Sequence, residues 1–498
     1  MTTATRARHR WATIMALALV LAACTSDSTA TTEEAGGTTT TSGGAETSTT
    51  AGEGTVDGDK PESLNMLYAT VEANFDAVNS MIPAFEEATG IQINVDSQPY
   101  EALQQRVFAE LASESDFYDI IIVDTPWMPA LTNQVEPLSG YLADESLNDI
   151  ADVDLVDFIP AVFYDTAVYN QAESNLRFPG DASTVDLDAI LGEGFEVFGL
   201  PIQANALTMA YRADLFNDPE EQAGFEAEYG RALAYPVTWD EFTEVAQWFT
   251  RPEENLYGTT LMAGAGEWGT TDFKSFAASA GGDGTLVDDQ FNITFNDPAA
   301  IEGLTFYASL INDLQVTPPG TTNSSWDDTG AAFDQGLTAM TMNYHSFDLE
   351  SGEVAYGVIP AKAGESPGPH FGTWMLSVNK FSNNKDWAYR AITWFTSSAT
   401  QIEMLQSQLH PTRVSVYEAA ANDPSLTEQF GNFYEALGAS LATGQGRPRL
   451  TNYGEVSGAV GTAVNAVANG ADPQATMDAA AQEVAQLLEQ AGYVVGDI

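Results

Sequence analysis

The stretch DIIIVD, residues 119–124, is a continuous run of branched apolar residues between two aspartates. Such a run is typical of a strand that is buried on both faces, as in a parallel sheet. Upstream, LNMLYAT (64–70) and IQINVDS (91–97) predict two further strands, and NSMIPAFEEATG (79–90) and YEALQQRVFAELAS (100–113) predict amphipathic helices. The order strand, helix, strand, helix, strand predicts the start of an open, doubly wound α/β domain.

Helix signals continue through the rest of the chain. In TWDEFTEVAQWF, Thr238 and Glu241 have the spacing of a capping box. Asp472 precedes a proline and predicts the start of a long C-terminal helix over 473–490. With 498 residues, the chain is too long for a single hydrophobic core, so we expect two domains.

The N-terminus carries the pattern of an export signal. Three arginines precede an uncharged apolar run, Trp11 to Ala22, whose length suits a secretory signal better than a membrane span. Leu21-Ala22-Ala23-Cys24 resembles the lipobox of bacterial lipoproteins, which implies removal of residues 1–23 and lipidation of Cys24. The alternative is an ordinary signal peptide with a chance cysteine. Lipidation predicts an exported chain anchored to the outer face of the cytoplasmic membrane, at a cell surface or in a periplasm.

Residues 24–62 are predicted to form a disordered tether. They are mainly Thr, Ser, Gly, Ala and Glu, with no aromatic residue and very few large aliphatic residues. Such a segment cannot bury enough apolar surface to offset the entropy of ordering it. It is expected to act as a flexible linker between the anchor and the folded part.

Composition excludes several classes of function. The formal net charge is −54, which disfavours nucleic acid and anionic lipid as partners. Cys24 is the only cysteine, so no disulfide is expected. The sequence contains no Gly-x-Ser-x-Gly, His-Glu-x-x-His or phosphate-loop motif, and its histidines lack metal-ligand spacing. We therefore predict no catalytic residue, no metal and no cofactor. His345 and His370 either line a cleft or make surface and hydrogen-bonding contacts.

Six segments, in this order behind a lipobox, resemble the extracellular solute-binding proteins of bacterial ABC importers, especially the carbohydrate- and polyol-binding group. The segments are IPAFEEATGIQINV, DIIIVDTPWMPAL, GLPIQANALTMAYRADLF (199–216), FDQGLTAMTMNYHS (333–346), GTWMLSVNKFSNNKDWAYRAITWFTS (372–397) and HPTRVSV (410–416). The resemblance covers roughly residues 63–493. No single motif carries it; the order and spacing do.

The resemblance implies a two-lobed, periplasmic-binding-protein-like α/β fold. Each lobe is expected to hold an open, mainly parallel sheet flanked by helices, and a multi-strand hinge joins the lobes. Because the chain crosses the hinge more than once, lobe one is predicted over 63–203 plus 360–418, and lobe two over 207–357 plus 424–493. The solute is expected between the lobes, and hinge closure produces the form that the permease recognises.

Polar and aromatic residues follow each of the first three predicted strands. In an open parallel sheet, ligands bind beyond the carboxyl ends of the strands. A polyhydroxyl ligand needs carboxylates and amides for its hydroxyls and aromatic faces for its C–H groups. The candidates at these strand ends are Glu72, Asn74, Gln98, Tyr100, Asp124 and Trp127. Asp124 is the strongest of them, although a second interpretation is an N-cap for the helix at Pro126.

The resemblance adds candidates farther along the chain. Asn205, beside Gln203, matches a position that often carries a polar ligand contact in the family, and Trp374 matches a ligand-stacking tryptophan. Tyr344 stands where another aromatic residue is usual. Arg413 is expected either to reach a ligand hydroxyl or to hold the closed cleft by an ion pair. Weaker candidates in a Gly-rich loop are Glu267 and Trp268.

Together these observations predict a monomeric, non-catalytic binding module. It would capture a small neutral polyhydroxyl ligand, such as a sugar, an oligosaccharide or a sugar alcohol, and deliver it to the permease subunits of an ABC transporter. One alternative is the same fold binding a peptide or another small solute. Another is a secreted glycoside-acting enzyme that uses two carboxylates.

Overall fold

The computed structural model describes residues 60–70, 74–347 and 353–498. The predicted signal sequence, Cys24, nearly all of the predicted tether and Glu72 lie outside the described residues. Among the described helices, none combines the length and the apolar character that a membrane span requires.

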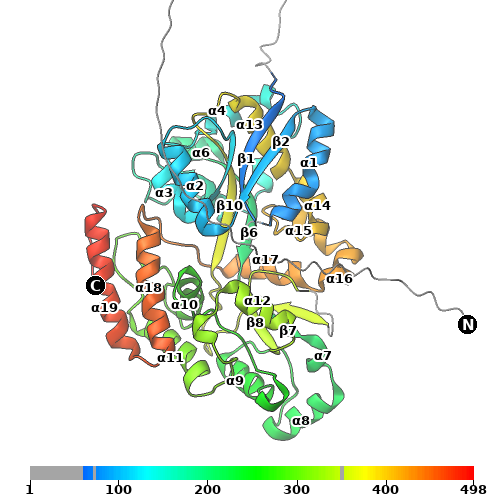
Figure 1. Ribbon diagram of the computed structural model, residues 1–498, viewed down its shortest axis with the longest axis vertical. Coiled ribbons are helices and arrows are strands. Elements are labelled where there is room, and N and C mark those ends of the chain that lie inside the picture. Colours follow the sequence, from blue (N-terminus) through cyan, green and yellow to red (C-terminus); the bar gives the residue numbers. More distant parts are fainter. Residues whose placement is uncertain (1–59, 71–73, 348–352) are drawn as a thin grey trace, which may run out of the picture. The chain divides into compact units, whose positions relative to one another are not determined.

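The first sheet has five strands in the order β2-β1-β3-β10-β6 (Figure 1). Their bounds are β1 Ser63–Ala69, β2 Gln92–Gln98, β3 Ile120–Asp124, β6 Leu200–Ala206 and β10 Phe371–Val378. Strand β1 pairs in parallel with β2 and β3, and β10 runs antiparallel to both β3 and β6. All five residues of β3 are buried, as its continuous apolar run predicts.

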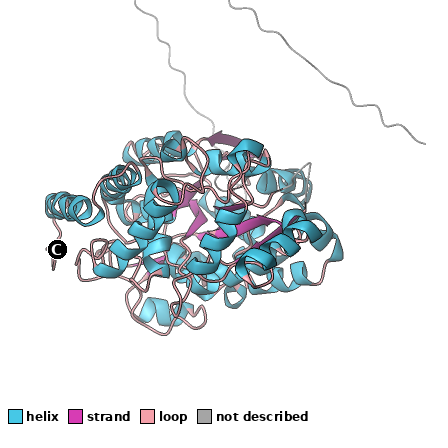
Figure 2. Cartoon of the chain, turned by 90° about the horizontal axis from the view of Figure 1, so that it is seen from below, coloured by secondary structure: helices cyan, strands magenta, loops and turns pink. Residues whose placement is uncertain are grey.

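The helices that connect the first three strands lie where the sequence predicts them, although the first begins four residues before the predicted segment 79–90. Helix α1 spans Phe75–Thr89 and α2 spans Tyr100–Ala112. Asn74 begins α1, and its side-chain oxygen accepts a hydrogen bond from the Ala77 amide. Helices α13 (Lys385–Thr396) and α14 (Ser398–Met404) pack near α1. Figure 2 shows the helices arranged around strands that lie at the centre.

The second sheet has three strands in the order β8-β7-β9, with bounds β7 Thr208–Arg212, β8 Met340–Asn343 and β9 Val354–Gly357. Both β8 and β9 pair antiparallel to β7. The expectation of a mainly parallel sheet in the second lobe was therefore wrong in this detail. Its strands are only four or five residues long, and apolar runs this short do not encode strand direction.

A second hydrophobic core surrounds this sheet and is built largely from helices. They are α9 Trp239–Trp248, α10 Glu267–Ser279, α11 Pro298–Asn312, α12 Trp326–Asp334, α18 Tyr453–Ala468 and α19 Pro473–Gln490. The capping box of Thr238 and Glu241 is present at the start of α9. Asp472 caps α19, whose bounds match the predicted C-terminal helix.

The chain passes between the two sheets at three places in the described residues. Only Leu207 separates β6 from β7, and further crossings lie between β9 and β10 and between α17 (Phe433–Thr443) and α18. A third hydrophobic cluster lies beside these crossings and includes residues of α5 (Pro160–Ala167), α15 (Val414–Ala421), α16 (Pro424–Phe430) and α17. Repeated crossings are the pattern expected of a multi-strand hinge; the predicted lobe boundaries stay a prediction.

The remaining elements are short or peripheral. Their bounds are α3 Met128–Leu131, α4 Ser139–Leu142, β4 Val168–Tyr169, α6 Leu187–Gly192, β5 Glu196–Val197, α7 Ala213–Phe216 and α8 Pro219–Tyr229.

Candidate functional site

A cavity of about 50 Å³ lies at the carboxyl end of β3, where residues around both sheets meet. Its lining residues are Tyr100, Asp124, Asn205, Trp326, Tyr344, His345, His370, Gly372, Trp374 and Arg447. Five of the residues predicted from the sequence therefore line one cavity. Sheet register explains the meeting: on β10, Trp374 pairs with Asp124 of β3, and Gly372 pairs with Asn205 of β6.

The centre of the site is one guanidinium between two carboxylates. Arg447 Nη1 donates to Asp124 Oδ1 at 3.1 Å, and its Nε donates to Glu267 Oε1 at 2.9 Å. The Tyr100 hydroxyl donates to the other Asp124 oxygen at 2.8 Å. Asp124 makes no capping bond to the short helix that follows β3. The geometry therefore favours the site interpretation of Asp124 over the N-cap interpretation.

Arg447 is held in place by its neighbours. Two residues just before Arg447 are fixed through their backbone. Gln445 forms an isolated parallel β-bridge with His370, which precedes β10, and the Gly446 carbonyl oxygen accepts a hydrogen bond from Lys274 Nζ of α10 at 2.6 Å. A side chain at Gly372 would place its Cβ only 3.2 Å from Arg447 Nη1, so glycine there leaves room for the guanidinium.

Glu267, in the first turn of α10, is held by hydrogen bonds from two residues of α18. The Tyr453 hydroxyl donates to its Oε1 at 2.8 Å, and Ser457 Oγ bonds to its other oxygen. Asp124 belongs to the first sheet and Glu267 to the second core, so Arg447 joins the two halves of the molecule at the cavity.

Burial and charge act in opposite directions on this group. Burial raises the pKa of Asp124 to about 6, although Arg447 and the Tyr100 hydrogen bond lower it. Burial lowers the pKa of Arg447, but Asp124 and Glu267 more than offset this, so its pKa lies well above the usual value. At neutral pH, Asp124 is therefore mainly ionised and Arg447 is charged.

Aromatic rings form the walls of the cavity. Tyr100 contacts Trp127, Trp326 and Trp374, with ring centroids 5.3, 6.1 and 5.9 Å away. Trp268 packs edge-on against Trp326 at 5.5 Å. Trp127 and Trp268 are not lining residues but support those that are. The indole N–H groups of both are buried without a hydrogen-bond partner in the described structure.

Two neutral hydrogen-bonding clusters complete the site. Gln203 Nε2 donates to Asn205 Oδ1 at 2.8 Å, and His410 Nδ1 lies 2.7 Å from the same oxygen. The Tyr344 hydroxyl lies 2.8 Å from His370 Nδ1, and His370 Nε2 is buried with no hydrogen-bond partner among the described residues. Burial first, then Arg447 and Lys274, lower the pKa of His370 well below its usual value, so this imidazole is neutral.

Besides Trp127, Gln203 and Trp268, which support the lining residues, three other predicted residues lie outside the cavity lining. Asn74 begins α1 and donates from Nδ2 to the carbonyl oxygens of Ser407 and Gln408. Gln98 donates to the Asp96 carboxylate at 2.6 Å. Arg413 donates to the backbone carbonyls of Val153, Asp154 and Thr396. Its ion pair, with Asp157 at 3.7 Å, lies away from the cavity lining.

Arg447 and Trp326 were missed by the sequence analysis, and Glu267 was ranked low. Arg447 lies in the irregular segment GQGRPRL (444–450), which has no periodicity to interpret. One feature of the sequence could have pointed to this segment: it holds two arginines, Arg447 and Arg449, in a chain with only 17 lysines and arginines. Both histidines that were left open, His345 and His370, line the cavity.

A buried polar cavity between two α/β halves joined by several chain crossings defines a two-lobed binding protein. Residues 68–402 match the family described as bacterial extracellular solute-binding protein, so the chain belongs to that family. Its members are the non-enzymatic binding components of ABC importers. This family membership argues against the alternative of a secreted glycoside-acting enzyme.

Individual relatives agree with the assignment. A probable ABC transporter-binding protein of Deinococcus radiodurans is 25% identical over 429 residues, covering 81% of this chain and 88% of that protein. A mannitol-binding protein of Pseudomonas aeruginosa is 24% identical and covers 60% of each chain.

Solved structures confirm the predicted fold class. The maltose-bound MalE3 of T. maritima has a TM-score of 0.68 at 22% identity, covering 86% of this chain and 100% of that one. A ribitol-bound ABC transporter solute-binding protein of Agrobacterium radiobacter has a TM-score of 0.67 at 24% identity, with the same coverage.

Proposed function

We propose that this solute-binding protein captures a neutral carbohydrate, either a sugar, an oligosaccharide or a sugar alcohol, and delivers it to an ABC permease. One observation carries the proposal: a buried carboxylate, guanidinium and amide group lies inside an aromatic enclosure. Carboxylates and guanidinium groups bond strongly to hydroxyls, and aromatic faces cover C–H surfaces. Solved structures of the same fold with maltose and ribitol support this choice of ligand.

Charge pairing supports a neutral ligand over an anionic one. Arg447 is the one arginine or lysine that lines the described cavity, and it already bonds Asp124 and Glu267. An anionic solute would have to displace one of these carboxylates, whereas a hydroxyl can bond to their free lone pairs. The same pairing argues against the terminal carboxylate of a peptide.

The cavity volume supports a hinge movement. About 50 Å³ is less than the share of two water molecules, at about 30 Å³ each, and is too small for a sugar. The rings of Tyr100 and Trp326, from opposite sides, are in contact across it. We infer that the solute enters when the lobes rotate apart about the three crossings and is enclosed when they close.

We further propose that Cys24 is lipidated and holds the exported protein at the outer face of the cytoplasmic membrane. The lipobox-like sequence supports this proposal. Mass spectrometry of the membrane-extracted protein should find the N-terminal peptide beginning at a diacylated Cys24. A cut elsewhere, with an unmodified cysteine, would overturn it.

A thermal-shift screen tests the solute class. The fragment 61–498 is heated with mono-, di- and trisaccharides, sugar alcohols and tripeptides. Ligand at a hundredfold excess over its dissociation constant adds about 2.7 kcal/mol to the free energy of unfolding, which raises the melting temperature measurably. We expect a shift with at least one neutral carbohydrate and none with peptides.

Conservative variants locate the binding. Asp124→Asn and Trp374→Phe should reduce the shift, whereas Asp144→Asn and Trp248→Phe, which change the same residue types outside the cavity, should retain it in full. A shift with peptides alone, or one that survives both cavity substitutions in full, would contradict the proposed function.

A further inference from the structure

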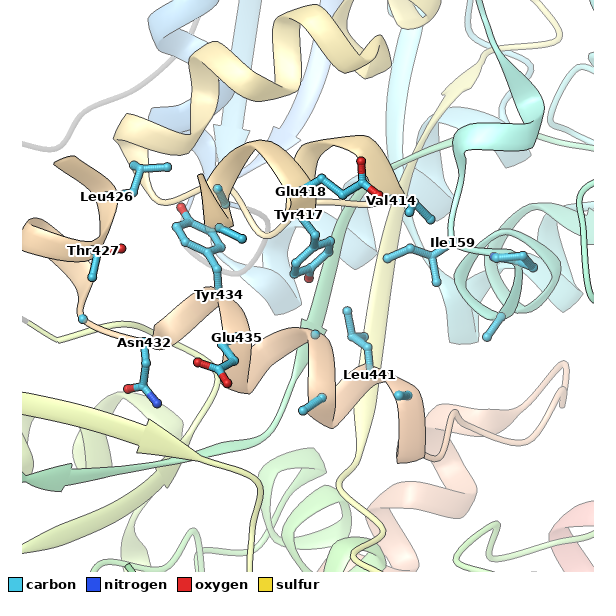
Figure 3. Close-up of a pocket in the computed structure, with 18 residues that line it drawn as sticks. Ile159, Val414, Tyr417, Glu418, Leu426, Thr427, Asn432, Tyr434, Glu435 and Leu441 are labelled. Atoms are coloured by element: carbon cyan, nitrogen blue, oxygen red, sulfur yellow. The ribbon is translucent and has the colours of Figure 1, made fainter. Parts of the chain in front are cut away.

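A second, larger hollow lies beside the hinge. It has a volume of about 650 Å³ and is bounded by the start of α5 and by helices α15, α16 and α17 (Figure 3). It shares no lining residue with the solute cavity. We call it the hinge groove; its lining includes Ile159, Val414, Tyr417, Leu426, Gly438 and Leu441.

The walls of the hinge groove are mostly apolar and carry several small side chains. Ala420 and Ala421 contribute from α15, and Gly438, Ala439 and Ala442 contribute from α17. Such small side chains leave space that larger ones would fill. A groove of this volume and character is within the range of small-molecule sites, and filling it would remove apolar surface from water.

One polar group inside the groove is unsatisfied. Tyr417 stands between α15 and α17 with its hydroxyl toward α17 (Figure 3). This hydroxyl is shielded from solvent and has no hydrogen-bond partner in the described structure. By contrast, two neighbouring polar side chains are occupied: Tyr434 donates to the Leu405 carbonyl, and Asn432 bonds to the Tyr356 backbone. A buried hydroxyl without a partner is costly, so this position calls for a ligand atom.

The groove's charged lining residues have one sign. Glu418 of α15 and Glu435 of α17 are its only charged lining residues, and neither forms an ion pair among the described residues. Two carboxylates that flank an apolar floor favour a cation and oppose an anion.

We propose that the hinge groove is a second binding site, for a small amphiphilic cation: an aliphatic or aromatic body with an ammonium head. The body lies along the small residues of α15 and α17. The head lies between Glu418 and Glu435, and a turn of the Tyr417 side chain toward the groove brings its hydroxyl oxygen within reach of the head. This site is independent of the carbohydrate proposal, because it needs no residue of the solute cavity.

Three probes of equal chain length and different charge test the proposal by calorimetry at physiological salt: octylammonium, octanol and octanoate. We expect octylammonium to bind at least about tenfold more tightly than octanol, because a charge-assisted hydrogen bond adds about 1.4 kcal/mol or more. Octanoate should bind more weakly still. Ethylammonium, which has the charge without the chain, should not bind. This arm controls for general attraction of cations to a chain with a net charge of −54.

Filling the groove provides the matched variant. A Cβ at Gly438 would lie 3.4 Å from the Tyr417 ring, an ordinary contact, so Gly438→Leu should fold and occupy the space. This variant should bind octylammonium at least about tenfold more weakly than the wild type does. Gly458→Leu on α18, where nothing lies within 4 Å, is the control and should leave binding unchanged.

The double variant Glu418→Gln with Glu435→Gln tests the role of charge separately. Its affinity for octylammonium should fall to the affinity for octanol. The proposal is overturned if octylammonium does not bind, if all three probes bind equally, or if Gly438→Leu leaves its affinity unchanged.

Discussion

Two buried arginines mark two regions of this molecule that differ in their hydrogen-bond acceptors. Arg413 donates to three backbone carbonyls of the first core and lies over the Phe158 ring at 3.8 Å. Arg447 donates to two side-chain carboxylates that belong to different halves of the molecule. Burial lowers the pKa of Arg413 to about 10, whereas Asp124 and Glu267 raise that of Arg447 despite its burial.

The difference lies in what each guanidinium bonds. Backbone carbonyls are positioned by the fold, so Arg413 ties together the segments that carry them. The Asp124 carboxylate, on the cavity wall, has lone pairs beyond those that Arg447 and Tyr100 use, so it can accept a bond from a solute hydroxyl. Burial of an arginine therefore does not distinguish a structural role from a binding role; its acceptors do.

The largest predicted effect is on stability at Arg413. Arg413→Met should lower the free energy of unfolding by about 3 kcal/mol or more, because three carbonyls, two of them in buried hydrogen bonds, and Asp157 lose a donor. Urea unfolding measures the change. Arg106→Met, on an exposed ion pair of α2, should cost about 0.5 kcal/mol or less. If Arg413→Met unfolds like wild type, or loses solute affinity while keeping its stability, the contrast between the arginines fails.

A smaller effect is expected on affinity at Arg447. Arg447→Lys keeps the charge but cannot bridge both carboxylates with a planar fork. Affinity for the carbohydrate found in the screen should fall about tenfold to a hundredfold by calorimetry, equivalent to about 1.4 to 2.8 kcal/mol. Arg390→Lys makes the same change at an ion pair with Asp149, outside the cavity, and should leave affinity unchanged. Equal losses in the two variants would refute a binding role for Arg447.

Local pattern was sufficient for much of the fold. The continuous burial of β3 and the amphipathic period of α2 are properties of consecutive residues, so both elements were predicted within a residue or two of their observed bounds. The antiparallel direction of β7, β8 and β9 was not predictable in this way. These strands pair across more than a hundred residues of sequence, and short apolar runs do not encode direction.

The same division applies to the site. Asp124 and Tyr100 were predicted because they follow strands of one parallel unit, and strand ends converge at a sheet edge. Arg447 is 323 residues from Asp124, and only tertiary structure brings them together. Arg413 was misleading because a buried arginine near a family motif looks the same in sequence whether its acceptors are carbonyls or carboxylates.

The smallest predicted effect is a pH dependence of solute affinity that arises from Asp124. Because burial raises the pKa of Asp124 to about 6, its ionised fraction falls about fourfold between pH 7.5 and 5.5. If the ionised form binds the solute, affinity should fall about fourfold over this range by calorimetry. Asp124→Asn should bind more weakly with no such dependence. Stability should move the other way: between about pH 4 and 6 the folded carboxyl keeps a proton that the unfolded chain has lost, so its contribution to stability falls as pH rises. A wild-type affinity that stays constant with pH, or a dependence that persists in Asp124→Asn, would show that the titrating group lies elsewhere.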